Sequence, residues 1–62
     1  MTLDEVQQLC EGDQLSFRAG VKHSRAIADV VTENYVRVLW TGGNGSDIVY
    51  KHSPIWEAME KR

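Results

Sequence analysis

The chain is poor in cysteine, and this limits the chemistry open to it. Cys10 is the only cysteine among 62 residues, so an internal disulfide and a metal site built of cysteines are both excluded. A single thiol is typical of proteins from a reducing compartment. We therefore expect a cytoplasmic protein.

Long apolar segments are also lacking. The longest apolar runs span a few residues, whereas a membrane helix needs about 20. The first ten residues carry Asp4 and Glu5 where a secretory signal would carry lysine or arginine, and no apolar stretch follows them. We expect neither a membrane segment nor a targeting segment.

The length of 62 residues predicts a single domain over residues 1–62. A chain this short buries only about 60% of the surface that its unfolded form exposes. Its free energy of unfolding should be about 3–5 kcal/mol, and oligomerisation is a common way to raise this value. The content of 42% hydrophobic and 26% charged residues is that of a globular domain.

The charges are unevenly distributed along the chain, whose net charge is −2. Residues 1–13 hold four carboxylates and no base, whereas residues 14–52 hold five bases and three acids. Affinity for nucleic acid comes from Lys and Arg releasing counterions. An acidic chain is therefore a poor generic nucleic-acid binder. A local basic patch in the middle segment is compatible with the sequence.

A short helix is predicted over residues 2–10. Thr2 and Glu5 have the spacing of a capping box, in which each side chain bonds the backbone N–H of the other. Apolar side chains then recur at spacings of three and four, which places them on one buried helical face: Leu3, Val6, Leu9 and Cys10.

Four strands are predicted after this helix, over residues 14–19, 25–32, 35–40 and 47–51. The alternation of apolar and polar residues is clearest in the first and third strands. The strand over 25–32 is apolar on both faces, which indicates either a bulge or a helix that covers its outer face. The sequence does not decide which face of this strand is buried. Residues 20–24 are expected to form a loop, and Ser53 with Pro54 predicts a C-terminal helix.

Two segments resemble the small β-barrels of the SH3-like and Tudor-like superfamily. Gly12–Phe17 resembles the Gly-Asp opening of their first strand, and Val36–Gly43 resembles their third strand, which often reads V-x-V-x-W before a glycine turn. Ile48–Tyr50 then falls where such barrels place a fourth strand. The resemblance covers residues 12–52. It implies a mainly-β fold, a small barrel of four to five antiparallel strands with a short helix at each end.

The same superfamily contains type II dihydrofolate reductases, tetramers whose central pore is lined by a Val-Gln-Ile-Tyr motif. Asp47–Tyr50 matches this motif at the tyrosine, but the chain lacks the glutamine that would contact nicotinamide and pterin. The departure argues against this activity, and we expect no cofactor, no metal and no catalytic residues.

Two groups of side chains are candidates for binding a partner. The segment 18–25 places basic or potentially basic side chains beside Gly20, in a loop of the kind that binds partners on a rigid barrel; a solvated loop is the alternative. Aromatic residues beside a base form the second group. The candidate residues are Arg18, Lys22, His23, Arg25, Tyr35, Arg37 and Tyr50. Trp40 and Trp56 are assigned to the core.

These features predict a non-catalytic binding module that contacts a protein, including a second copy of itself, through the 18–25 loop and the nearby aromatics. Nucleic acid is the alternative partner, and an oligomeric pore-type reductase is a further alternative. Val31, Leu39 and Val49 are expected on the outer face of the barrel, where they would promote self-association. Both a monomer and a homo-oligomer fit the sequence.

Overall fold

The computed structural model describes residues 1–43 and 45–62. Within them the chain is mainly β, as predicted, with five antiparallel strands and little helix. The elements in chain order are α1 (Leu3–Gln7), β1 (Gln14–Ala19), β2 (Lys22–Val31), β3 (Tyr35–Trp40), β4 (Ser46–Tyr50), the 3-10 helix η1 (Pro54–Ala58) and β5 (Met59–Lys61).

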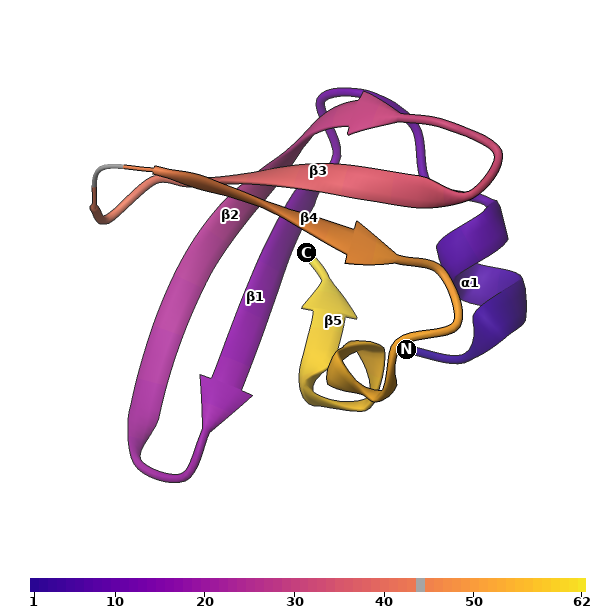
Figure 1. Ribbon diagram of the computed structural model, residues 1–62. Helices are drawn as coiled ribbons and strands as arrows, with labels where there is room; N and C mark the ends of the chain where they lie inside the picture. Colours follow the sequence, from indigo (N-terminus) through magenta and orange to yellow (C-terminus); the bar gives the residue numbers. More distant parts are fainter. Residues whose placement is uncertain (44) are drawn as a thin grey trace.

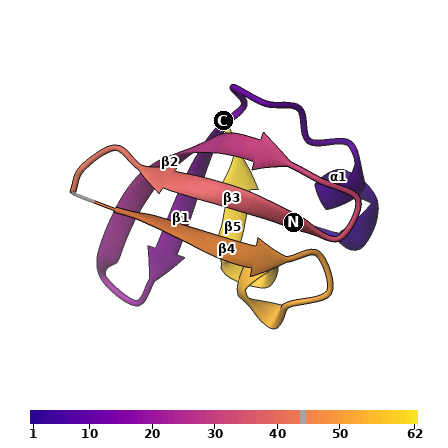
Figure 2. The same ribbon diagram turned by 45° about the horizontal axis from the view of Figure 1, so that its top comes forward.

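The strands form one sheet in the order β4-β3-β2-β1-β5. Strand β2 is long and curved, so that β3 and β4 cross over β1 in Figure 1 and over both β1 and β5 in Figure 2. Over the described residues β4 and β5 remain the two ends of the sheet and do not pair. The sheet is therefore strongly bent but open, and the small barrel that the sequence predicts is not closed.

Two local causes keep the sheet open. The last strand, β5, has only three residues, Met59–Lys61, and all three pair with β1. Beyond β4 the chain turns away, because the Tyr50 carbonyl accepts hydrogen bonds from the Ser53 N–H at 2.9 Å and from the Trp56 indole N–H at 2.9 Å.

The core lies inside the bend of the sheet and takes side chains from every element. α1 and the residues after it cover one end, and η1 covers another, as Figure 1 shows. Trp56 is buried, as predicted, and fills the space under η1. The buried apolar residues are Val6, Leu9, Leu15, Ala26, Ala28, Val36, Val38, Val49, Trp56 and Met59.

Of the two explanations offered for the apolar faces of β2, the bulge is present, and it decides which residues of that strand are buried. The register between β2 and β3 shifts between Ala28 and Val30. The extra residue, Asp29, reverses the alternation, so Val31 packs against the core while Val30 pairs with Arg37 on the opposite face.

Helix α1 is shorter than the sequence predicts, although its capping box is present. The Thr2 hydroxyl accepts from the Glu5 N–H at 3.3 Å, and the Glu5 carboxylate accepts from the Thr2 N–H at 2.9 Å. This hydrogen bond from the Thr2 backbone lowers the pKa of Glu5. The helix ends at Gln7 rather than near residue 10.

A turn after α1 explains the early end of the helix. The Cys10 N–H donates to a carboxylate oxygen of Asp13 at 2.8 Å, which lowers the pKa of Asp13, and Lys61 lies 3.5 Å from the same carboxylate. Cys10 is exposed, so its assignment to the buried stripe is wrong.

The predicted C-terminal helix is a single 3-10 turn followed by a strand. Ser53 caps η1 as expected, its hydroxyl accepting from the Ile55 N–H at 3.4 Å. After Ala58 the chain extends, because Met59 pairs with Phe17 and buries its side chain in the core. The expectation of a short helix at each end therefore fails at this end.

Candidate binding surface

The segment predicted as a basic loop is a β-hairpin. β1 and β2 pair from Gln14↔Ile27 to Ala19↔Lys22, and only Gly20 and Val21 form the turn. Gly20 has a φ of 63°, which suits a two-residue hairpin connection. The four consecutive polar residues 22–25 belong to β2, so the prediction of a loop over residues 20–24 is wrong apart from the turn.

The four basic candidates lie on two different faces of the hairpin. Arg18 pairs directly with His23, and Arg25 lies two residues further along β2, so these three share a face. Lys22 pairs with Ala19 on the opposite face. The structure therefore brings three of the four side chains together.

Carboxylates lie beside this basic group. Arg18 and His23 line a shallow cavity of about 470 Å³ together with Glu57 and Glu60. The surface around the hairpin consequently carries charges of both signs rather than one continuous basic patch.

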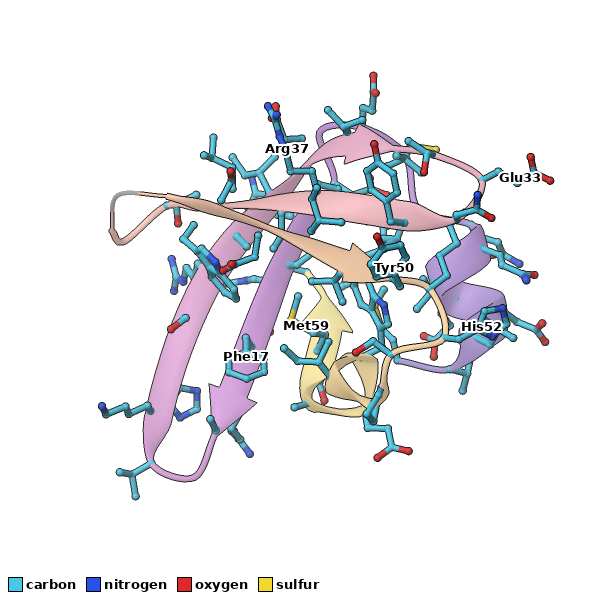
Figure 3. The ribbon with its side chains drawn as sticks, viewed as in Figure 1. Phe17, Glu33, Arg37, Tyr50, His52 and Met59 are labelled. Carbon is cyan, nitrogen blue, oxygen red and sulfur yellow. The ribbon has the colours of Figure 1, made fainter. Side chains whose placement is uncertain are left out.

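The second candidate group is brought together on β3 and β4. Tyr35 pairs with Tyr50 across the strands, and their rings meet edge to face with centroids 6.0 Å apart. Arg37 follows Tyr35 on the same face of β3, and its Nε donates to Asp29 at 3.0 Å. In Figure 3, Phe17 and Met59 lie inside the bend of the sheet, whereas Arg37 points away from it.

Apolar side chains surround Arg37 on this outer face of β2, β3 and β4. Their exposed fractions are large: 42% for Leu39, 55% for Ile48 and 63% for Tyr50. The cross-strand pairs Ile27↔Leu39, Val30↔Arg37, Arg37↔Ile48 and Tyr35↔Tyr50 make the surface continuous. We name it the outer patch, consisting of Ile27, Val30, Tyr35, Leu39, Ile48 and Tyr50.

The sequence misassigned part of this surface. Of the three residues expected outside, only Leu39 is there, because Val49 is buried and Val31 packs on the core. Ile48 was missed as a surface residue. The alternation in β4 is ambiguous, since Asp47 shares the inner face with Val49 while Ile48 and Tyr50 lie outside.

Asp47 of β4 places an acidic side chain on the inner face, at the open end of the sheet. The Trp40 indole N–H donates to a carboxylate oxygen of Asp47 at 2.6 Å. Trp40 also meets Phe17 edge to face, with ring centroids 5.9 Å apart. Trp40 is only half-buried and packs against the core, so its assignment to the core holds in part.

Over residues 1–43 and 45–62, no three His, Cys, Asp or Glu side chains are grouped to hold a metal ion. Helices in the same range are too short to cross a membrane. Comparison with protein-family models, with curated proteins and with solved structures gives no match for this chain.

Proposed function

We propose that the chain is a non-catalytic protein-binding module whose contact surface is the outer patch together with Arg37. Tyrosine and arginine are the residue types that most often dominate binding energy at protein interfaces. The single exposed thiol of Cys10 supports a reducing, cytoplasmic setting.

The observation that carries the proposal is the exposure of large apolar side chains on two adjacent strands, β3 and β4. Leu39 of β3 and Ile48 and Tyr50 of β4 are exposed on one face of the sheet. A contiguous apolar surface of this kind, with charged groups within it, marks an interaction site more often than it serves the fold. The Asp29–Arg37 ion pair supplies polar groups that a partner can bond.

The topology supports placing the chain among the SH3-like folds. The strand order β4-β3-β2-β1-β5 and the 3-10 turn between β4 and β5 agree with an SH3-like arrangement of a bent antiparallel sheet. The open edge between β4 and β5 departs from a fully closed barrel. Because functions are grafted onto folds, this placement adds no ligand by itself.

The carboxylates beside the basic hairpin favour a protein partner over nucleic acid. Glu57 and Glu60 lie in the same cavity as Arg18 and His23, where they would repel phosphates. A nucleic-acid binder would be retained on a nucleic-acid column in a strongly salt-dependent manner, and we expect no such retention.

Site-specific photo-crosslinking in the native host tests the proposal. A photoreactive phenylalanine analogue replaces Tyr50 in one variant and Val21, which is 95% exposed at the hairpin tip, in a matched control. We expect discrete crosslinked protein species from position 50 and not from position 21. Adding Leu39→Lys to the first variant should abolish them, because it replaces an apolar contact with a second cation on the same face as Arg37.

Two results would overturn the proposal. One is an absence of crosslinks at position 50, and the other is the same set of species from both positions. Crosslinks between two copies of the chain would identify self-association as the function of the outer patch. Folding of each variant is checked by circular dichroism, and exposed substitutions of this kind change the free energy of unfolding by about 0.5 kcal/mol.

A further inference from the structure

The free edge of β4 has a defined hydrogen-bonding pattern. The Trp40 N–H donates to the Gly45 carbonyl at 3.1 Å, and the Lys51 N–H donates to the Asn34 carbonyl at 3.0 Å. Because bonded and non-bonded pairs alternate in an antiparallel ladder, every second residue of β4 turns its backbone groups away from β3. These residues are Ser46, Ile48 and Tyr50.

Only part of this edge is used within the described residues. The Tyr50 carbonyl accepts from Ser53 and Trp56, but the N–H groups of Ile48 and Tyr50 and the carbonyls of Ser46 and Ile48 face outward. The other edge of the sheet differs, since the amino group of Met1 donates to the carbonyl oxygens of Trp56 and Met59 at 2.7 Å each. The β4 edge is therefore the one that offers unpaired groups over several residues.

A groove of about 370 Å³ runs along this edge. Residues from both faces of β4 line it, which places it at the edge of the strand rather than on either face. Asp47 and Val49 line it from within the bend, together with Trp40 of β3, and Ile48 and Tyr50 line it from outside. Ile55 of η1 forms the opposite wall. An extended chain lying here would direct alternate side chains toward Trp40 and Ile55 on one side and toward Ile48 on the other.

The charge in the groove is negative. Asp47 is the charged side chain of its lining, and one of its two carboxylate oxygens accepts from the Trp40 indole at 2.6 Å. Within residues 1–43 and 45–62 the second oxygen has no hydrogen-bond partner, and the chain carries a net charge of −2. An occupant with a lysine or arginine next to its apolar residues is the charge-complementary choice.

We propose that the partner binds by adding an extended segment to the edge of β4 as a further strand, with alternating apolar residues and one basic residue against Asp47. The inference rests on the proposed protein-binding function and names the mode of recognition and the chemistry of the partner. Main-chain hydrogen bonds to Ile48 and Tyr50 supply affinity, and the groove beside Trp40 selects the side chains.

Selection from a displayed library of random decapeptides tests this inference. We expect enriched peptides that alternate apolar residues and carry Lys or Arg. Ile48→Pro removes an outward N–H without touching the pairing to β3, and it should weaken binding of these peptides about tenfold. Ile48→Thr keeps the N–H and should weaken binding about threefold. Asp47→Asn should weaken peptides with a basic residue about threefold and leave neutral ones unchanged.

Exchange of backbone amides in the wild-type chain avoids any effect of proline on folding. Binding of a selected peptide should slow exchange at Ile48 and Tyr50, while Asp47 and Val49, which already face β3, change little. Unchanged exchange at Ile48 in the bound state would overturn the inference.

The library separates this inference from the function on which it rests. Peptides whose binding is lost with Leu39→Lys but kept with Ile48→Pro would support the outer patch and overturn strand addition. Binding that neither substitution affects, or no enrichment at all, would overturn both. A dimer of the free chain that Ile48→Pro dissociates would assign the edge to a second copy and overturn the peptide occupant.

Discussion

The stability of the sheet should depend on Leu15 far more than on Leu39. Leu15 is fully buried, and its position in β1 pairs with Ala26 of β2 and Lys61 of β5, so it packs where three strands meet. Truncating a buried leucine to alanine costs about 3 kcal/mol through lost apolar burial and the cavity left behind. A chain of 62 residues has a free energy of unfolding of about 3–5 kcal/mol. Leu15→Ala should therefore remove most of it.

Leu39→Ala is the matched control, because it deletes the same atoms from the neighbouring outer surface. Leu39 is 42% exposed, so the same substitution should cost less than about 1 kcal/mol. Urea unfolding followed by circular dichroism measures both. With a slope of about 1 kcal/mol per molar urea, the midpoint should fall by about 3 M for Leu15→Ala and by less than about 1 M for Leu39→Ala. Equal losses, or a larger loss at Leu39, would refute the assignment of the two faces.

Three further outcomes concern the turn at Asp13, the turn at Gly20 and the two tryptophans. Because the Cys10 N–H lowers the pKa of Asp13 below 3.8, this carboxylate stabilises the fold above that pH, and the contribution is lost as the pH falls through the lower native value. Asp13→Asn should therefore reduce the fall in urea midpoint between about pH 7 and about pH 2; an unchanged pH dependence would contradict it. Gly20→Ala should cost about 1 kcal/mol in urea unfolding, since φ is 63° and nothing lies within 4 Å of the added methyl group; a stabilised variant would contradict the left-handed turn. In acrylamide quenching, Trp40→Phe should remove the more accessible tryptophan emission, because Trp56 is 2% exposed and Trp40 is half-buried; similar quenching before and after the substitution would contradict this difference.

Local patterns in the sequence were sufficient for the strands with clear alternation. Gln14–Ala19 and Tyr35–Trp40 have the bounds that the sequence predicts, because each alternates apolar and polar residues between turn residues. The capping box at Thr2 and the N-cap at Ser53 were also predicted correctly, since both depend on residues only two or three positions away.

Features that depend on distant residues were not predictable in this way. The length of the 3-10 turn is decided by the hydrogen bond from Trp56 to the Tyr50 carbonyl and by the pairing of Met59 with Phe17. The faces of β4 are decided by pairing with β3, which puts Asp47 on the inner side at the open end of the sheet. The pattern of residues within β4 alone does not predict that Asp47 lies on the inner side.

The candidate site was predicted in part. Tyr35, Arg37 and Tyr50 were chosen from residue type, and the pairing of β3 with β4 brings them together. Ile48 escaped notice because its role comes from exposure and from an unpaired backbone edge, and both are properties of the assembled sheet.

Amide hydrogen exchange of the free chain tests most directly whether β4 is an open edge. Asp47 and Val49 should exchange slowly, because their N–H groups face β3, whereas Ile48 and Tyr50 should exchange orders of magnitude faster from the solvent side. Slow exchange at all four residues would mean that the edge is already paired, and would contradict both the open sheet and the binding edge built on it.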